Sequence, residues 1–103
     1  MVKLTKEIIL DTLHKNRKKI RSFGVKKLIL FGSFARDEQK KTSDIDFLVE
    51  FEEQREHSVD DYLNLLHFLE DTFNKKIDLV KPHLVRDFLK PYILEGIQYE
   101  ATI

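Results

Sequence analysis

The chain has 103 residues, of which 42% are hydrophobic and 11% aromatic, enough for one small core but not for two independent ones. Its 18 basic and 18 acidic residues cancel, which excludes a net charge that would draw it to nucleic acid or to an anionic membrane. It has no cysteine, which excludes a disulfide framework and thiolate metal sites. We therefore expect residues 1–103 to form a single domain.

The sequence has no segment typical of export or membrane insertion. Its apolar runs are far shorter than the roughly 20 residues that a transmembrane helix needs, and Met1 begins no charged-then-apolar signal segment. We therefore expect a soluble cytoplasmic protein that binds no membrane and has no strong general affinity for nucleic acid.

Residues 5–22 are predicted to form an amphipathic helix, with Thr5 as a residue that can cap its start. The apolar residues that give the helical spacing are Ile8, Ile9, Leu13 and Ile20. The basic cluster, residues 14–21, leaves two interpretations open. It is either a solvated helix face or a surface for a polyphosphate or an acidic partner.

Two predicted strands enclose a turn and a loop. Residues 25–31 form a compact apolar run that ends at Gly32. A short helix over residues 33–38 and a polar loop over residues 37–43 are expected to follow. Residues 45–51 then predict a strand with one apolar face and a second face that carries acidic residues.

The next segment contains the longest predicted helix. Residues 52–57 are charged and without a period, as in a solvent-exposed loop, and Ser58 is a typical N-cap. The apolar stripe that follows predicts a helix up to Phe73. Residues 76–80 predict a short strand, which Pro82 bounds.

The last part of the chain is less sharply patterned. Residues 83–90 suggest a helix, which Pro91 interrupts and residues 92–96 resume. For residues 99–103, a last short strand and an ordered tail both remain open. The order of the elements predicts an α/β fold, in which helices pack on a small sheet.

Three aspartates follow this pattern in a way that indicates a site. Asp44 and Asp46 are one residue apart at the head of a predicted strand, so their side chains share a face, roughly 7 Å apart along the backbone. Asp78 occupies a matching position in a later strand, and the three carboxylates converge if the strands are neighbours. Such a cluster repels itself unless cations neutralise it, and oxygen ligands select Mg²⁺ or Mn²⁺.

The turn before these acids suits a nucleoside triphosphate. Mg²⁺ commonly lies between a few carboxylates and the phosphates of a substrate. Gly32 lets the backbone approach a phosphate closely, and Ser33 offers a hydroxyl and an N–H group at the start of a helix. Arg36, one turn later, can reach a phosphate or pair with an acidic neighbour.

The spacing of these residues resembles the signature of the DNA polymerase β superfamily of nucleotidyltransferases. The pattern GSxxR (Gly32, Ser33 and Arg36) is followed by a loop and by SDID, which runs from Ser43 to Asp46. Because the chain is small, it looks most like the minimal nucleotidyltransferase group, whose members often act as antitoxins beside a ribonuclease toxin with a HEPN domain. The resemblance implies a polymerase β-like fold with a small mixed sheet flanked by helices.

The resemblance also implies roles for individual residues. Asp44 and Asp46 would bind two Mg²⁺ ions, with Mn²⁺ as an alternative, and Asp78 would help to bind one and act on the acceptor hydroxyl. The nucleotide, ATP, would be held by Gly32 and Ser33, with Arg36 and Ser43 as further signature positions. The expected reaction transfers AMP to a tyrosine of the cognate HEPN toxin in a prokaryotic cytoplasm.

Two points remain open. Many relatives have glycine directly after the signature arginine, whereas this chain has Asp37, which either lies near the phosphates or faces water; the solvent-facing position is the one expected. The acceptor is also open, because the chain has almost nothing beyond the catalytic core. Alternatives are a non-catalytic antitoxin that only covers its toxin, and transfer to a small molecule or an RNA end.

Overall fold

The computed structural model describes residues 3–55, 58–82 and 96–103. The helices and strands of these residues are α1 (Lys6–Lys15), α2 (Arg17–Ser22), β1 (Val25–Phe31), α3 (Gly32–Ala35), β2 (Ile45–Phe51), the 3-10 helix η1 (Glu53–Arg55), α4 (Val59–Phe73), β3 (Ile77–Val80) and β4 (Tyr99–Glu100).

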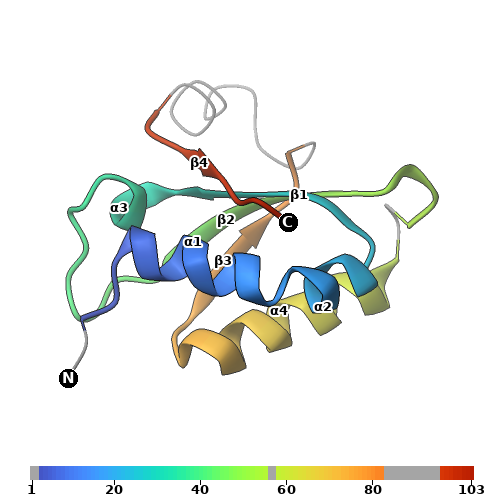
Figure 1. Cartoon of the computed structure of the whole chain (residues 1–103), viewed down its shortest axis with the longest axis horizontal. Coiled ribbons are helices and arrows are strands. Elements are labelled where there is room, and N and C mark those ends of the chain that lie inside the picture. Colours follow the sequence, from blue (N-terminus) through green and yellow to red (C-terminus); the bar gives the residue numbers. More distant parts are fainter. Residues whose placement is uncertain (1–2, 56–57, 83–95) are drawn as a thin grey trace.

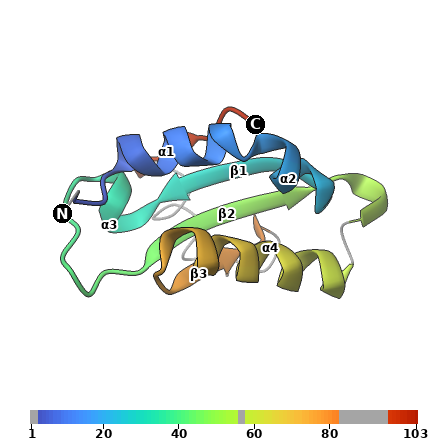
Figure 2. The same cartoon turned by 60° about the horizontal axis from the view of Figure 1, so that its bottom comes forward.

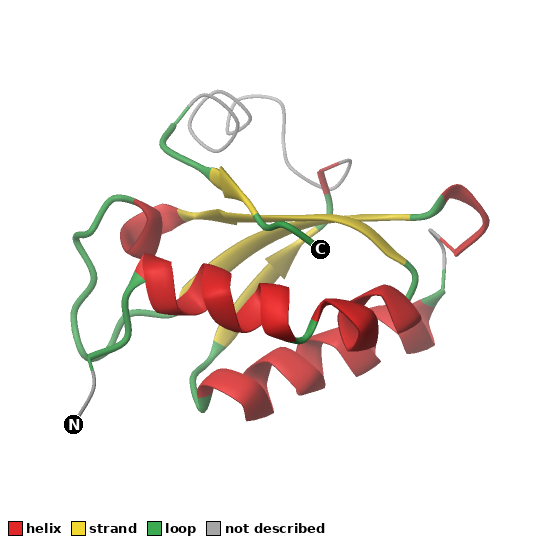
Figure 3. Cartoon of the chain, viewed as in Figure 1, coloured by secondary structure: helices red, strands yellow, loops and turns green. Residues whose placement is uncertain are grey.

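The strands form one mixed sheet in the order β3-β2-β1-β4. β1 runs antiparallel to β2 and to β4, whereas β2 and β3 are parallel. Helices α1, α2 and α4 lie together on one face of this sheet, as Figure 1 and Figure 2 show from two directions. Figure 3 shows the same division, with the red helix layer below the yellow strands. The predicted α/β architecture is therefore confirmed.

The hydrophobic core lies between the sheet and the helices. Leu65 and Leu69 of α4 are fully buried against it, as the predicted apolar stripe requires. The other core residues are Ile9, Leu13, Ile20, Val25, Leu28, Leu30, Phe34, Ala35, Ile45, Phe47, Val49, Phe51, Ile77, Leu79 and Ala101.

The N-terminal helix begins as predicted but is not continuous. The Thr5 hydroxyl accepts a hydrogen bond from the Ile8 N–H group at 3.3 Å and caps α1. The prediction of one helix over residues 5–22 is wrong, because α1 ends before Asn16, whose φ of −103° and ψ of 18° are not helical. The Asn16 side chain donates to the Thr12 carbonyl at 2.8 Å, a local bond that competes with helix continuation.

The strand predictions hold for residues 25–31 and 45–51, and β3 is one residue shorter than expected. The predicted helix after Ser58 is confirmed, with the Ser58 hydroxyl accepting from the Asp61 N–H group at 3.1 Å. The predicted loop over residues 52–57 contains η1, and the open choice at the C-terminus falls to a short strand, β4. The helices suggested for 83–90 and 92–96 lie outside the described residues, apart from Gly96.

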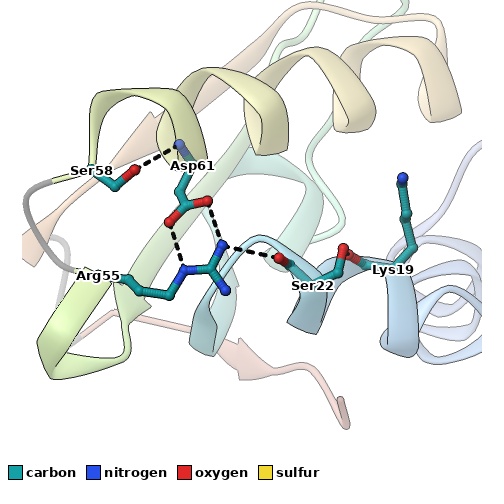
Figure 4. A network of polar contacts seen from close by, with 5 residues as sticks. All are labelled: Lys19, Ser22, Arg55, Ser58 and Asp61. Carbon is teal, nitrogen blue, oxygen red and sulfur yellow. Dashed lines mark hydrogen bonds and ion pairs between the residues drawn. The ribbon is translucent and has the colours of Figure 1, made fainter.

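A polar network joins three segments where β1 begins. Arg55 donates to both carboxylate oxygens of Asp61, at 2.8 and 2.6 Å, and to the Ser22 carbonyl at 3.1 Å (Figure 4). Asp61 is only 8% exposed, and its neighbour Ser58 caps the same helix. The network therefore connects the end of α2, the turn after β2 and the start of α4.

In the described ranges, no helix is both long enough and apolar enough to cross a membrane.

Candidate active site

Asp46 and Asp78 lie opposite each other on neighbouring strands. β2 and β3 are parallel, and their register pairs Asp46 directly with Asp78. The condition on which the sequence analysis depended, that these two strands are neighbours, is therefore met. In a pair of adjacent parallel strands, side chains at paired positions point to the same face of the sheet, so the two carboxyl groups meet there.

The environment of Asp46 disfavours its charged form. Burial, a hydrogen bond with Asp78 and the negative charges of Asp78 and Asp44 raise the pKa of Asp46 from 3.8 to about 7, although Arg36 acts in the opposite direction. A hydrogen bond between two carboxyl groups requires a proton on one of them. Ionisation of both carboxyl groups is therefore unfavourable without a cation to neutralise them.

Gly32 provides the space in which the Asp46 carboxyl group lies. The residue follows β1 directly and has a left-handed φ of 77°, a conformation that favours glycine. A Cβ atom at this position would lie 2.8 Å from Asp46 Cγ and would overlap Asp46 Oδ2. Glycine is thus required here by backbone conformation and by contact with the acidic pair.

The turn after Gly32 is shorter than predicted. The helix expected over residues 33–38 is α3, which ends at Ala35, because Asp37 has a φ of 58°. The Glu38 N–H group donates to the Ser33 carbonyl at 2.9 Å and the Asp37 N–H group to the Phe34 carbonyl at 3.4 Å. This is the hydrogen-bond pattern of a Schellman motif, in which the left-handed position is usually glycine.

The structure explains how an aspartate is accommodated at position 37. Asp37 occupies the left-handed position of the motif, which aspartate tolerates better than most residues. Its side chain is 55% exposed and pairs with the Lys6 ammonium at 2.5 Å. The expected solvent-facing position is confirmed.

Arg36 and Ser43 make local contacts. Arg36 Nε lies 3.0 Å from Glu38 Oε2, so of the two possibilities open for this residue the structure has the acidic partner. The Ser43 hydroxyl accepts from the Lys40 N–H group at 2.8 Å and closes the loop before the aspartates. The Ser33 hydroxyl has no hydrogen-bond partner among the described residues.

Asp44 takes a different position from the other two acids. It precedes β2, and its Oδ2 atom lies 3.9 Å from the Lys76 ammonium, although its negative charge still contributes to the raised pKa of Asp46. In the part of the chain that the structure describes, no three acidic, histidine or cysteine side chains are arranged to hold a metal ion. The acidic pair, Asp46 and Asp78, is therefore what the fold brings together.

The acidic pair nevertheless fits a hard divalent cation. Its donors are carboxylate oxygens, and Mg²⁺ is commonly held by one or two carboxylates with the remaining positions taken by water and substrate phosphates. The pKa of Asp46 is raised by its partial burial and by the like charge of Asp78. A cation relieves this repulsion more fully than one proton does.

Two residues at the site were missed by the sequence analysis. Lys75 donates to the carbonyls of Lys41 and Ser43, at 2.9 and 3.3 Å, and so holds the loop that presents Asp44. Tyr62 was read only as part of an apolar stripe, yet its hydroxyl donates to the Leu79 carbonyl at 2.5 Å. Burial and the charge of Asp78 raise the pKa of the Tyr62 hydroxyl. No local pattern marks either residue, because both contacts cross between elements.

The basic cluster contains several local contacts. Lys15 lies 3.0 Å from Asp11, Arg17 donates to the His14 carbonyl, and Lys19 lies 5.3 Å from the centre of the Phe23 ring. These contacts favour the interpretation as a solvated helix face.

Comparison with known proteins identifies relatives over most of the chain. The family model described as nucleotidyltransferase domain matches residues 10–103. A Methanocaldococcus jannaschii protein, provisionally named a protein adenylyltransferase, is 37% identical over 91 residues, which are 87% of this chain and 88% of that protein. The protein adenylyltransferase MntA of Thermococcus cleftensis is 34% identical over 100 residues, 96% of this chain and 99% of that protein.

Two solved structures have a similar fold. One, provisionally described as a minimal nucleotidyltransferase, has a TM-score of 0.66 and 32% identity, covering 84% of this chain and 91% of that chain. The other, from a toxin–antitoxin crystal structure with AMP-PNP, has a TM-score of 0.65 and 20% identity, covering 96% of this chain and 73% of that chain. At 20% identity the second likeness concerns the fold alone.

Proposed function

Because the chain belongs to the nucleotidyltransferase domain family, we propose that it is an antitoxin that transfers AMP from ATP to a tyrosine of a cognate HEPN-type toxin. The modified toxin would lose its ribonuclease activity. Support comes from the named protein adenylyltransferase in Thermococcus cleftensis, and from the same fold in a toxin–antitoxin complex crystallised with AMP-PNP.

The observation that carries the catalytic part of this proposal is the acidic pair beside Gly32. A purely structural role would pair Asp46 with a base, as Arg55 is paired with Asp61. Instead Asp46 faces Asp78, and its pKa is raised to about 7. A partly buried carboxyl group that faces a second, exposed carboxyl group is typical of a functional site.

Asp46 and Asp78 would hold Mg²⁺, or alternatively Mn²⁺, and Asp44 would complete the set for two ions. Ions held there would neutralise the triphosphate and would lower the pKa of the acceptor hydroxyl. The Lys76 ammonium lies 3.9 Å from Asp44 in the structure. It would then release the Asp44 carboxylate and pair with another anion.

The turn that follows β1 would bind the nucleotide. Gly32 has no side chain, so the backbone can approach the triphosphate closely, and Ser33 offers a hydroxyl that has no other partner among the described residues. Arg36 lies close enough to lower the pKa of Asp46, and in our proposal it exchanges Glu38 for a phosphate oxygen. Ser43 keeps the loop closed on the other side.

The transfer step needs one nucleophile and one proton acceptor. The phenolic oxygen of the toxin tyrosine forms a bond to the α-phosphorus of ATP, the bond from that phosphorus to the bridging oxygen breaks, and pyrophosphate leaves. Asp78 accepts the phenolic proton or orients the hydroxyl. The remainder of the rate enhancement comes from positioning the two substrates.

The test uses the purified chain, Mg²⁺, ATP labelled at the α-phosphate, and the toxin encoded next to it. We expect label on a tyrosine of the toxin and loss of its ribonuclease activity. The double variant Asp44→Asn with Asp46→Asn should abolish the label, whereas Asp71→Asn, an exposed acid on α4, should leave it unchanged.

Other outcomes would contradict particular parts. Toxin inhibition without label would replace catalysis with simple covering of the toxin. Label that survives in the double variant would show that Asp44 and Asp46 do not carry the transfer. Label on a small molecule or an RNA end, without any partner protein, would keep the enzyme but change the acceptor.

The role of Asp78 has a separate test. Asp78→Asn should lower transfer more than it lowers ATP affinity, because the residue acts mainly on the acceptor side. Rates would be compared with the affinity for AMP-PNP in the presence of Mg²⁺. An equal loss in both would place Asp78 on the nucleotide side instead.

A further inference from the structure

Lys6 is a partly buried lysine at the start of α1. Its side chain is only 19% exposed, although lysine is seldom buried without a partner. The ammonium lies 2.5 Å from the Asp37 carboxylate and 5.3 Å from the centre of the Tyr99 ring. Lys6 therefore joins α1 to the end of the α3 turn and to β4, two segments far away in the sequence.

The partner of Lys6 lies at a conformationally demanding position. Asp37 has a φ of 58°, which disfavours residues with a side chain unless local contacts compensate. Through the same motif, the Glu38 N–H group binds the Ser33 carbonyl at 2.9 Å. A change in the backbone at Asp37 is thus passed directly to Ser33.

A second contact ties the N-terminal segment to the same turn. The Gln39 side chain donates to the Leu4 carbonyl at 3.4 Å, and its Oε1 atom is buried without a hydrogen-bond partner among the residues that the structure describes. Residues 4–6 therefore lie against residues 37–39. This contact restricts how far the loop can move away from α1.

We propose that Lys6 is a positioning residue, which holds the left-handed turn at Asp37 and thereby the Gly32–Ser33 backbone in the conformation that binds the nucleotide. This inference rests on the proposed function, because it assumes that Gly32 and Ser33 contact the triphosphate. Glycine in place of Asp37 would adopt the same left-handed turn without strain, and the turn would then not depend on Lys6.

The experiment is a double-mutant cycle on KM and kcat for ATP. Lys6→Met keeps the aliphatic stem and removes the charge, and it should raise KM for ATP about fivefold with kcat unchanged, the scale of a coupling near 1 kcal/mol. Asp37→Gly should have nearly the original KM. Adding Lys6→Met to Asp37→Gly should then change KM little.

A matched control is Lys15→Met, which breaks the exposed ion pair with Asp11 on the same helix and should leave KM unchanged. If Lys6 only stabilised the fold, Lys6→Met would lower Tm with either Asp or Gly at position 37 and would leave KM unchanged. The inference is overturned if Lys6→Met does not alter KM. It is also overturned if KM rises equally with Gly at position 37, because Lys6 would then contact the nucleotide itself.

A second measurement separates this inference from the proposed function. Amide hydrogen exchange at Glu38 reports the bond to Ser33 whether or not any transfer occurs. Lys6→Met should accelerate this exchange, and Asp37→Gly should restore it, while the Glu52 amide, bonded to the Gly24 carbonyl at 2.7 Å, stays unchanged. Unaltered exchange at Glu38 would overturn the positioning role even in a chain that transfers no AMP.

Discussion

Each end of β1 has a glycine in the left-handed conformation, with a charged side chain packed against it. Before the strand, Gly24 has a φ of 81°, and a Cβ atom there would lie 2.7 Å from Arg55 Nε. After the strand, Gly32 has a φ of 77°, and a Cβ atom would overlap the Asp46 carboxylate. The two backbones are alike, whereas the charges against them are opposite.

The partners of these charges differ as well. Arg55 binds Asp61 through two hydrogen bonds, which lower the pKa of the Asp61 carboxyl group. Asp46 faces a second carboxyl group, which together with burial raises its pKa to about 7. The comparison teaches that burial of an acid does not by itself mark a site. The charge of the neighbouring side chain decides whether the acid stabilises the fold or is suited to bind a cation.

The largest expected effect comes from exchanging each glycine for alanine. Gly32→Ala should lower transfer about a hundredfold, because the added Cβ displaces Asp46, and misplacement by about 1 Å can cost that much. Gly24→Ala should lower Tm but leave kcat unchanged. Steady-state kinetics and thermal unfolding of both variants give the answer. Equal loss of activity in the two would remove the functional difference between the ends of β1.

The second prediction concerns Asp61, the acid that is paired with Arg55. Asp61→Asn should lower the free energy of unfolding by about 1–2 kcal/mol, because it weakens hydrogen bonds to a charged group in a mostly buried setting. The measurement is urea unfolding at pH 7, with Asp71→Asn as an exposed control on the same helix. A variant as stable as the original would show that the Arg55 network contributes nothing to the fold.

At the other end of β1, removing the charge of an acid is expected to raise the free energy of unfolding. Asp46→Asn should raise the free energy of unfolding by at least about 1 kcal/mol at pH 7.5 without divalent cations, because one pKa unit corresponds to about 1.4 kcal/mol and the pKa of Asp46 is raised by more than one unit. The change relieves the repulsion from Asp78. Urea unfolding in the presence of a chelator checks this prediction, and destabilisation would indicate that the acidic pair is a structural contact.

The last prediction concerns the pH dependence of the two acids. Because the pKa of Asp46 is raised in the folded chain, the folded state binds more protons between pH 3.8 and about 7, and stability should fall as pH rises through this range. The Asp61 pKa is lowered, so its contribution is present above about pH 4 and is lost as pH falls further. Comparing each Asn variant with the original chain across pH isolates the two contributions, and parallel curves would contradict the assignment.

Much of the fold is readable from local patterns. The stripe that includes Leu65 and Leu69 predicts α4, and alternation predicts β2, because burial of one face is a property of neighbouring residues in the chain. Thr5 and Ser58 mark helix starts for an equally local reason, since each caps an N–H group three residues away. The break at Asn16 was missed, because the apolar spacing continues across it to Ile20.

The site is only partly readable in this way. The sequence by itself determined which acids stand at the heads of strands, that glycine and serine follow the first strand, and that an aspartate stands at position 37. Only the tertiary structure decided that β2 and β3 are adjacent and in the register that sets Asp46 against Asp78. It also placed Lys6 beside Asp37, 31 residues away in the chain, and Asp44 beside Lys76. Strand neighbours and ion pairs depend on how the elements pack, and a local pattern of residues holds no information on that packing.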